Sequence, residues 1–499
     1  MIFLGIDISP AGTHALALDL ESASVLADCH EPHPWMEHVP DGSLEQHPMR
    51  WIEAIDRAVR SCLAAIPQDL RKVAAIGVGS CLQGVVILDH QDRVIRPCKM
   101  PGDASAKTQA EEIARAFGGN PGLIELIGQS MSIDSAAAQC LWLKRHEPDH
   151  FSQIARVFSL KDFINYWLTG EAATDAGIAS ASGLWDVRRR QWSEEICDFI
   201  DPTLIRTLAP LRHPFKPLAT LRKSLAEHWD IDAQALVSLG SGSPMLSCLS
   251  AGCASAGEIS LDWSGCARLI GISPEPCIDL RGELSALCDA TGQWLIAGTT
   301  THAIGAPEMI CRHYGWSITE LESMIRSSPP GADGLLFLPY INSEKKPHLP
   351  EATGVLHGVT YQNFTPAHLA RATLEGVILD IGYHLERMQE QGFHPAQITV
   401  TGKACQSQLT RELLADVCGV PVIGLSSPHS AAHGAAIHSA MMFFQHNGET
   451  LPVQDLARYF VRFDESTRSE PRSSNHTLYQ ELISRQQYLV DTLHPAGFL

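Results

Sequence analysis

The feature that most constrains this chain is a strand–turn–strand pattern that occurs at its start and again near its middle. Apolar residues over 2–8 and 15–20 flank a turn at residues 9–12. A second cycle begins near residue 240, where apolar strands at 258–262 and 267–272 flank another short turn. Strand and helix patterns alternate after each pair, as in an α/β fold. The recurrence predicts two related α/β domains with a cleft between them.

The domain boundaries follow from the place where the second cycle begins. We expect a first domain over 1–245, a second domain over 246–447, and an extension over 448–499 in which a surface loop precedes a final helix. A chain of 499 residues is long enough to bury two separate cores.

Charge and cysteine content argue against several classes of function. There are 56 acidic and 37 basic residues, a formal charge of −19, which opposes binding to nucleic acid or to an anionic membrane surface. No apolar tract is long enough to span a membrane, and the first residues lack the basic segment of a secretory signal. The 14 cysteines are scattered without a Cys-x-x-Cys pair, which indicates free thiols in a reducing compartment. We therefore expect a cytoplasmic protein.

Residues 354–376 form the most distinctive segment, Gly-Val-Leu-His-Gly-Val-Thr-Tyr-Gln-Asn-Phe-Thr-Pro-Ala-His-Leu-Ala-Arg-Ala-Thr-Leu-Glu-Gly. It resembles the second signature of the FGGY carbohydrate kinases, and residues 45–51 resemble the family's Glu-Gln-x-Pro-x-x-Trp. Segments at 141–148, 337–340 and 344–348 are similar to the xylulokinase branch of that family. The matching signature residues are Gly354, Leu356, Gly358, Val359, His368, Leu369, Ala372, Thr373, Leu374, Glu375 and Gly376.

This resemblance implies a fold and a reaction. The fold would be two actin-like ATPase domains of the ribonuclease H-like type. The reaction would be transfer of a phosphoryl group from ATP to a hydroxyl of a sugar or polyol, with Mg²⁺ as cofactor. Members similar to xylulokinase often form homodimers. The chain departs from the family at the positions that handle phosphate.

The first turn retains only part of the family pattern Gly-x-Asp-x-Gly-Thr-Ser/Gly. The resemblance assigns Asp7 to Mg²⁺ and the following backbone N–H groups, up to Gly12, to the γ-phosphate. Ser9 and Pro10 replace the glycine and threonine, and a proline has no N–H to donate. A phosphate cradle depends on such donors. The competing interpretation is an ordinary strand turn that carries a surface Asp.

The second turn reads Leu-Asp-Trp-Ser-Gly at 261–265, where the family has Leu-Gly-Thr-Ser-Gly. Ser264 and Gly265 remain as candidate phosphate ligands. We expect Asp262 and the indole of Trp263 to occupy the place of the phosphate oxygens. Two interpretations of Asp262 stay open, a relocated metal ligand and a carboxylate that caps the turn.

The position of the family's catalytic base is also changed. The pattern Gly-Gly-Gly-Asp-Asn becomes Gly-Ser-Gly-Ser-Pro at 240–244, so that Ser243 stands where the Asp would accept the proton of the sugar hydroxyl. A serine hydroxyl cannot serve as that base at neutral pH, and losing a positioned base lowers the rate about 10²- to 10⁴-fold. The segment does not fit the Gly-x-Ser-x-Gly turn of a serine hydrolase.

The adenine and sugar sides are altered as well. The family's glycine triplet before the nucleotide helix becomes Gly-Lys-Ala at 402–404, so that Gly402 remains. Lys403 is either a phosphate contact or a solvated residue at a helix start. On the sugar side, Gln83, Gly84 and Asp103 are the candidate substrate ligands. The family's Trp and His are absent there, and Gln139 occupies the position of a Lys in its first signature.

Three hypotheses remain open after these comparisons with the family pattern. The first is a protein that folds as an FGGY kinase, has lost most or all phosphotransferase activity, and serves a sugar-responsive, regulatory or scaffold role. The second is an active ATP-dependent sugar kinase of unusual chemistry that uses Asp7 and Asp262. The third is another activity in the cleft, such as hydrolysis. A sugar or polyol is the expected ligand, and a second copy or another protein is the candidate partner.

Overall fold

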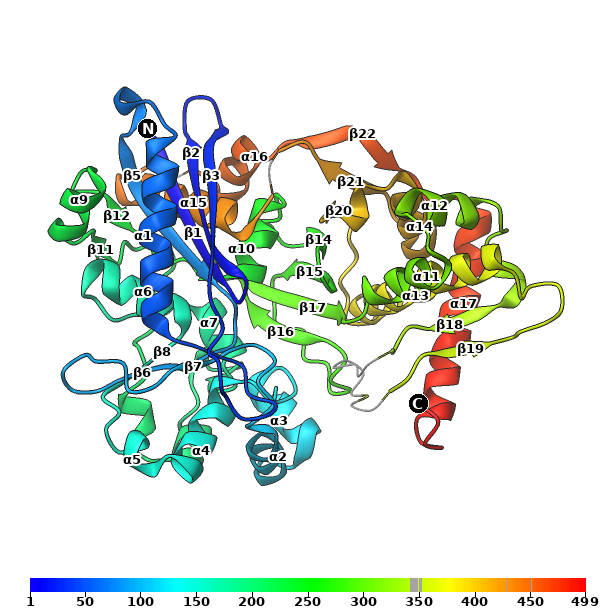
Figure 1. The fold of residues 1–499 in the computed structure, drawn as a ribbon, viewed down its shortest axis with the longest axis horizontal. Helices are drawn as coiled ribbons and strands as arrows, with labels where there is room; N and C mark the ends of the chain where they lie inside the picture. Colours follow the sequence, from blue (N-terminus) through cyan, green and yellow to red (C-terminus); the bar gives the residue numbers. More distant parts are fainter. Residues whose placement is uncertain (342–348, 350–351, 428, 450) are drawn as a thin grey trace.

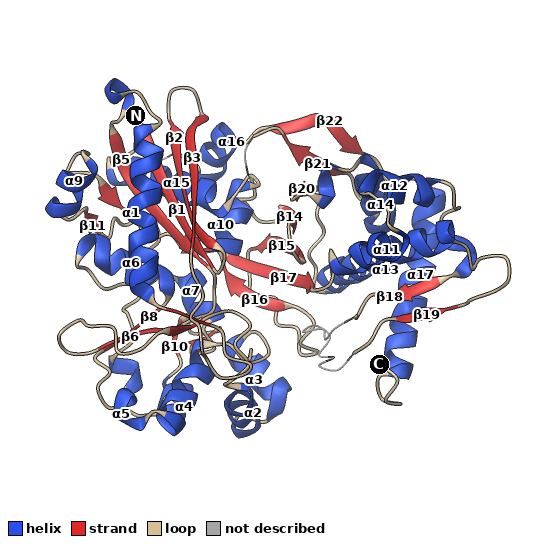
Figure 2. Ribbon diagram, in the orientation of Figure 1, coloured by secondary structure: helices blue, strands red, loops and turns tan. Residues whose placement is uncertain are grey.

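The computed structural model describes residues 1–341, 349, 352–427, 429–449 and 451–499. Two seven-stranded sheets dominate it, one built from the amino-terminal half of the chain and one from the later half, and helices cover both (Figures 1 and 2). The prediction of two α/β domains is therefore confirmed. The segment 344–348, which is similar to the xylulokinase branch, lies outside the described residues.

The first sheet is built around the hairpin at the start of the chain. In spatial order its strands are β11 (Ala219–Thr220), β12 (Leu236–Val237), β5 (Val73–Ser80), β1 (Ile2–Ser9), β2 (Gly12–Asp19) and β3 (Ser24–Pro32), with β13 (Ser241–Gly242) also paired to β5. β1 and β2 are antiparallel and Ser9 pairs with Gly12, so that only Pro10 and Ala11 form the turn. β5 lies parallel to β1. β1 is buried on both faces, which explains its nearly continuous apolar sequence.

The second sheet repeats this arrangement. Its spatial order is β16 (Ser285–Cys288), β17 (Trp294–Thr300), β15 (Ala267–Ser273), β14 (Ile259–Trp263), β20 (Ile398–Thr401), β21 (Val422–Leu425) and β22 (Phe463–Ser469). β14 and β15 form an antiparallel hairpin, and β20 lies parallel to β14 as β5 does to β1. The recurrence seen in the sequence is therefore a recurrence of sheet topology.

The remaining elements surround the sheets. The helices of the first half are α1 (Pro48–Ala64), α2 (Lys107–Ala116), α3 (Gly119–Ile127), α4 (Ala136–His146), α5 (Pro148–Phe151), α6 (Leu160–Thr169), α7 (Ala176–Ala181), α8 (Glu194–Ile200), α9 (Lys223–Trp229) and α10 (Ser243–Ser250). Those of the second half are α11 (Gly305–Tyr314), α12 (Ile318–Arg326), α13 (Pro366–Glu390), α14 (Gln408–Cys418), α15 (Ala431–His446), α16 (Val453–Phe460) and α17 (Ser473–Leu493). Short 3₁₀ turns are η1 (Gln68–Leu70), η2 (Leu204–Arg206), η3 (Ala332–Gly334) and η4 (Ala404–Gln406).

In the part of the chain that the structure describes, four pairs of short strands lie outside the two large sheets. They are β4 (Glu45–Gln46) with β7 (Cys98–Lys99), β6 (Val86–Leu88) with β8 (Arg156–Phe158), β9 (Trp185–Asp186) with β10 (Gln191–Trp192), and β18 (Leu336–Leu338) with β19 (Val355–His357). Over the residues given above, no helix has both the length and the apolar character needed to cross a membrane.

Helix α15 packs directly on the first sheet, where Figure 1 shows it in orange beside the blue strands. A methyl group added at Gly5 would lie 1.8 Å from the carbonyl oxygen of Ala432, and one added at Gly77 would lie 2.0 Å from that of Ala435. These glycines therefore allow helix and sheet backbones to touch. The predicted second domain included α15, and the predicted extension included β22 of the second sheet. The division at 245 and 447 stays a prediction.

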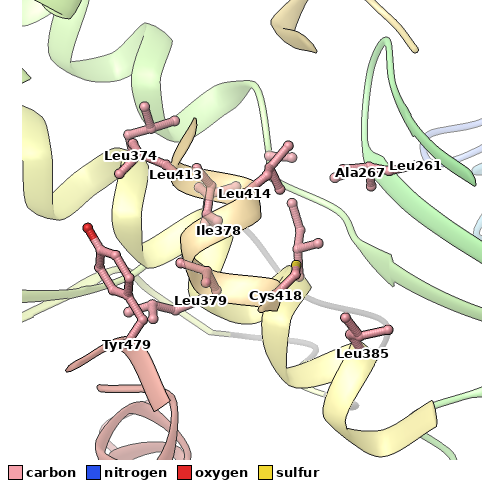
Figure 3. Close-up of a cluster of buried hydrophobic side chains, with 14 of the residues drawn as sticks. Leu261, Ala267, Leu374, Ile378, Leu379, Leu385, Leu413, Leu414, Cys418 and Tyr479 are labelled. Atoms are coloured by element: carbon pink, nitrogen blue, oxygen red, sulfur yellow. The ribbon is translucent and has the colours of Figure 1, made fainter. Parts of the chain in front are cut away.

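The signature segment builds the core of the second domain. α13 carries Leu374, Ile378 and Leu379 into a cluster of buried apolar side chains that α14 and α17 also line (Figure 3). A methyl group added at Gly376 would lie 2.2 Å from the carbonyl oxygen of Phe337. The segment that carries the family resemblance is thus held in place by packing.

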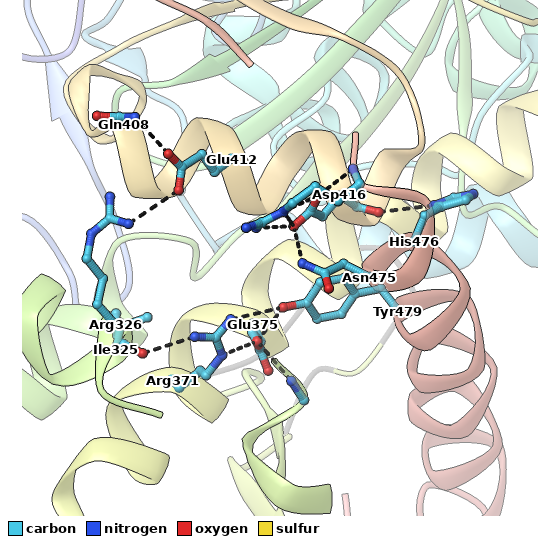
Figure 4. Close-up of polar contacts among 12 residues, drawn as sticks. Ile325, Arg326, Arg371, Glu375, Gln408, Glu412, Asp416, Asn475, His476 and Tyr479 are labelled. Atoms are coloured by element: carbon cyan, nitrogen blue, oxygen red, sulfur yellow. Dashed lines mark hydrogen bonds and ion pairs between the residues drawn. The ribbon is translucent and has the colours of Figure 1, made fainter. Parts of the chain in front are cut away.

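A buried ionic cluster attaches α13 to its neighbours (Figure 4). The carboxylate of Glu375 accepts hydrogen bonds from Nε of Arg371 at 2.6 Å, from the hydroxyl of Tyr479 at 2.6 Å and from the N–H of Gly331 at 3.2 Å. Burial raises the pKa of Glu375, and the charge of Arg371 opposes that shift. Nη1 of Arg371 also donates to the carbonyl oxygens of Ile325 and Ser328. The cluster joins α12, α13 and α17.

Candidate functional site

The fold brings Asp7 and Ser243 together although 236 positions separate them. Asp7 lies near the end of β1, and Ser243 is the first residue of α10. The hydroxyl of Ser243 donates a hydrogen bond of 2.6 Å to Oδ1 of Asp7. Burial raises the pKa of Asp7, while this hydrogen bond and the charge of His14 oppose the shift. The proton of Ser243 is directed to Asp7, and a neutral hydroxyl lacks the basicity with which a carboxylate takes a proton from a ligand.

In the first turn, the side chain of Ser9 forms hydrogen bonds with the backbone of Gly12 inside the turn itself. Oγ of Ser9 accepts the N–H of Gly12 at 3.3 Å and donates to the carbonyl oxygen of Gly12 at 3.1 Å. Pro10 has no N–H, and its carbonyl oxygen accepts from Nε2 of Gln46 at 2.8 Å. Gly12 is confined by β3, because an added methyl group would lie 2.4 Å from the carbonyl oxygen of Glu31. The turn therefore lacks a donor at Pro10, and its Gly12 N–H is already bonded to Ser9, which reduces the donors available to a phosphate.

His14 belongs to the same region, and the motif comparison missed it. It pairs with Asp7 across β1 and β2, and its Nε2 forms a hydrogen bond with Oδ1 of Asp28. Residues directly opposite in an antiparallel pair have Cβ atoms about 4.5–5.5 Å apart. A two-residue turn at Pro10 and Ala11 fixes this register, so the pairing could have been found from the sequence by assuming that turn.

The second turn corrects one expectation. Trp263 does not place its indole where phosphate oxygens would lie, because its side chain is only 1% exposed and packs in the core of the second domain. Residues alternate along a strand, so Leu261 and Trp263 share the core face and Asp262 lies on the opposite one. Oγ of Ser264 donates to Oδ1 of Asp262 at 2.7 Å, an arrangement that favours the turn-capping interpretation of this carboxylate.

The nucleotide-side candidates lie close to one another. Gly402, at φ +90°, follows β20, and a methyl group added there would lie 2.3 Å from the carbonyl oxygen of Trp263 and 2.7 Å from the N–H nitrogen of Ser264. This contact requires a glycine. It brings Gly402 and Lys403 beside the turn that contains Ser264 and Gly265. The side chain of Lys403 is exposed, which agrees with a solvated residue before η4.

His429 is a second residue that motif comparison missed. Its Nε2 forms a hydrogen bond of 3.0 Å with the carbonyl oxygen of Ser247 on α10. Burial lowers the pKa of His429, and the negative charge of Asp262 opposes that shift. The second turn therefore faces a histidine that is itself attached to the helix carrying Ser243. We found no pattern in the sequence that would have indicated this contact.

The sugar-side candidates differ in accessibility. Gln83 is partly exposed, while Gly84, at φ +111°, is buried and would place an added methyl group 2.5 Å from Leu160. Asp103 is 1% exposed and accepts hydrogen bonds from the N–H groups of Leu44 at 2.9 Å and Ser105 at 3.0 Å. Its carboxylate thus has a structural role, and Gln83 offers the more accessible side chain.

Gln139, at the position of the family's Lys, is buried as well. Its Nε2 donates to the carbonyl oxygen of Asp134 at 3.1 Å and to that of Lys99 at 3.4 Å. These bonds hold two backbone segments together. The Nε2 group is thus committed to the protein rather than to a ligand.

The geometry can be compared with what Mg²⁺ and ATP would need. Mg²⁺ binds through one or two carboxylates together with phosphate oxygens and water, and Asp7 could supply one such carboxylate. A triphosphate also needs donors from both turns, but the first turn lacks the N–H at Pro10 and the second carries the carboxylate of Asp262. These two features weaken the fit of a bound triphosphate.

Comparison with known proteins agrees with this architecture. Residues 2–250 match the amino-terminal domain of the FGGY family of carbohydrate kinases, and residues 272–443 match its carboxy-terminal domain. A xylulose kinase of Haemophilus influenzae is 26% identical over 490 residues, 97% of this chain and 98% of that protein. A xylulose kinase of Escherichia coli is 27% identical over 428 residues, 84% of this chain and 85% of that protein.

Solved structures show the same fold over the whole chain. A xyloylose kinase of Brucella ovis has a TM-score of 0.91 at 24% identity, and the match covers 99% of this chain and 100% of that one. The xylulose kinase of Rhodospirillum rubrum has a TM-score of 0.90 at 25% identity and covers 99% of each chain. The two-domain architecture is therefore the actin-like one of these kinases, and the chain belongs to the FGGY family of carbohydrate kinases.

Proposed function

We propose that this protein binds a sugar or polyol in the manner of a xylulokinase but has lost, or retains only a small part of, the phosphotransferase activity of its family. The observation that carries the proposal is the 2.6 Å hydrogen bond from Ser243 to Asp7. The family resemblance assigns the proton acceptor to this position, and a serine hydroxyl bonded to Asp7 is much less basic than the family's carboxylate. A sugar-responsive, regulatory or scaffold role, alone or with a second copy or another protein, follows from binding without turnover.

The phosphate side supports the same proposal. Phosphoryl transfer depends on donors, metal and base that are in place together. Here the base position is a serine, the first turn contains Pro10, and the second turn contains Asp262. Two like unit charges 4 Å apart repel by about 4 kcal/mol at an effective dielectric constant of 20, so a carboxylate beside a phosphate would oppose binding.

A second candidate is an active ATP-dependent kinase of a ketopentose or polyol. The buried indole of Trp263 favours it, because the second turn is not blocked by this side chain. Asp7 is also retained and could contribute to Mg²⁺ binding. This candidate needs another group to accept the proton.

Calorimetric titration with Mg·ATP, followed by a panel of sugars assayed for ADP release, separates the two candidates. D-xylulose is the first sugar to be tested because relatives of this chain are xylulose kinases. Sugar binding without ATP binding at millimolar concentration supports the proposal. Turnover of about 1–100 s⁻¹, the usual range for kinases, would reject it and establish the second candidate.

Restoring the missing carboxylate alone is expected to leave the protein without normal turnover. In Ser243→Asp we expect ADP release at least about 10²-fold below that of ordinary sugar kinases, because neither phosphate turn is repaired. The assay is the same sugar panel. Ser243→Ala serves as the matched control and should bind sugars as the unmodified protein does. Turnover in the ordinary kinase range in Ser243→Asp would show that the phosphate turns are competent.

A further inference from the structure

The two-residue strand β4 lies between the Pro10–Ala11 turn and residues 96–103, here called the sugar-side segment. β4 pairs antiparallel with β7, so that Glu45 lies opposite Lys99 and Gln46 opposite Cys98. Glu45 is 8% exposed and Gln46 is fully buried. Such a short strand contributes little by its backbone bonds alone. The two side chains make the remaining attachments, and they point to different parts of the site.

The amide of Gln46 is fixed at both ends. Its Oε1 accepts a hydrogen bond of 2.9 Å from Nε1 of Trp51, and its Nε2 donates to the carbonyl oxygen of Pro10 at 2.8 Å. An indole N–H can only donate and a carbonyl oxygen can only accept, so these partners determine the orientation of the amide. Trp51 is fully buried in α1. The first turn is therefore attached to α1 through one side chain.

The carboxylate of Glu45 holds the sugar-side segment. Its Oε1 accepts from Nη2 of Arg96 at 2.7 Å and from Nζ of Lys99 at 3.1 Å. Nζ of Lys99 also lies 3.5 Å from Oδ2 of Asp103 and 4.0 Å from the ring centre of Trp142. The charged groups of residues 96–103 are therefore arranged around Glu45.

We propose that Gln46 is a positioning residue that holds the Pro10–Ala11 turn in place after Asp7, and that Glu45 and Gln46 together couple this turn to the sugar-side segment 96–103. A shift of either segment would be transmitted through β4 to the other. The inference goes beyond the proposed function, because the coupling operates whether or not phosphoryl transfer takes place. The exchange of backbone amides therefore tests it without any assay of turnover.

The first experiment replaces Gln46 by glutamate, which has nearly the same shape. A protonated carboxyl can accept from Trp51 and donate to Pro10 as the amide does, whereas a carboxylate has no proton to donate. Hydrogen–deuterium exchange of the full chain is measured at about pH 5 and about pH 8 and corrected for intrinsic rates. We expect the amides of residues 11–13 in Gln46→Glu to match the unmodified protein at the lower pH, and to exchange at least about tenfold faster at the higher pH.

The surroundings of residue 46 allow this test to be interpreted. His33 forms a hydrogen bond with Gln46, and burial lowers the pKa of His33 to about 4, so that it is mainly neutral at both pH values in the unmodified protein. Glu45 and Lys99 on β4 and β7 are the nearby charged groups. Gln153→Glu is the matched control, because the amide of Gln153 also donates to a carbonyl oxygen but lies on the exposed surface. A change of protection in Gln46→Glu that does not depend on pH would overturn the positioning role.

The second experiment tests the coupling itself. Glu45→Gln removes the charge that holds Arg96 and Lys99, so we expect faster exchange in residues 96–103 and also in residues 11–13. Gln46→Leu should loosen the same two segments while leaving β14 and β15 of the second sheet unchanged. Faster exchange confined to residues 96–103 in Glu45→Gln, with unchanged exchange in the turn, would refute the coupling. Normal turnover in a kinase assay would refute the proposed function but not this inference.

Discussion

Replacing Lys161 by methionine is expected to lower the free energy of unfolding by about 3–5 kcal/mol, because it leaves buried carboxylates without their counter-charge. Lys161 is fully buried. Its Nζ donates hydrogen bonds to Oδ1 of Asp162 at 2.6 Å and to the carbonyl oxygen of Leu239 at 2.9 Å. The same Nζ lies 3.1 Å from Oδ1 of Asp175. Burial alone would lower the pKa of Lys161, but the charges of Asp162 and Asp175 outweigh it and raise the pKa. A raised lysine pKa stabilises the fold at all pH values below the ordinary pKa near 10.5, so the full loss is expected at neutral pH.

Urea unfolding of matched variants checks this expectation. Lys144→Met is the control, since the side chain of Lys144 is 38% exposed and its ion pair with Asp201 lies at the surface; surface pairs contribute about 0–1 kcal/mol. The cluster matters for the site because Oγ of Ser241 donates to Oδ2 of Asp175 at 2.6 Å, two residues before Ser243. A loss below about 1 kcal/mol in Lys161→Met would show that the two carboxylates find other partners or take up protons.

The fold could be predicted from the sequence where periodic patterns are long. The strands expected at 2–8 and 15–20 are β1 and β2, and the observed hairpin has a shorter turn because β2 begins at Gly12. Short strands were missed, β4 and β7 among them, because two residues carry no period. Their positions depend on tertiary contacts such as the bond between Gln46 and Pro10, which no local pattern encodes.

The candidate site could be predicted only in part. Resemblance to the family pointed to Asp7 and Ser243, and the structure joins them. Their roles in binding and catalysis, like those of the other candidate residues, stay predictions. The placement of Trp263 was wrong because motif comparison treated the turn as isolated, whereas alternation along β14 assigns its side chain to the core. His429 reaches α10 from a segment far along the chain, and a contact of that kind depends on the packing of α15.

The retained and altered parts of the family pattern serve different purposes in this molecule. In the signature, Glu375 forms hydrogen bonds and Gly376 packs closely within the second domain. Among the described residues, the contacts given above for these two residues involve neither turn. A chain can therefore keep this segment and its stability while the turns change. The contrast supports a folded, ligand-binding protein with little phosphotransferase activity, which the sugar panel tests.

The second large effect is a change of stability with pH caused by Asp380. This residue of α13 is fully buried and accepts hydrogen bonds from the hydroxyls of Thr300 at 2.6 Å and Tyr340 at 3.0 Å. Burial is the main cause that raises the pKa of Asp380 from 3.8 to about 6. Between these values the folded protein keeps a proton that the unfolded chain has lost, so raising the pH favours unfolding. We expect the free energy of unfolding to fall by roughly 3 kcal/mol from this group between about pH 4 and pH 7.

Asp380→Asn isolates this contribution because asparagine does not ionise. Urea unfolding across the same pH range should show the variant gaining stability relative to the unmodified protein as the pH rises, by roughly 3 kcal/mol in total. Thr300→Val provides the matched comparison. It removes a hydrogen bond that favours the ionised carboxylate, so the pKa of Asp380 should rise further and the loss of stability should extend to higher pH. A difference between Asp380→Asn and the unmodified protein that stays constant with pH would mean that Asp380 ionises equally easily in the folded and unfolded chain.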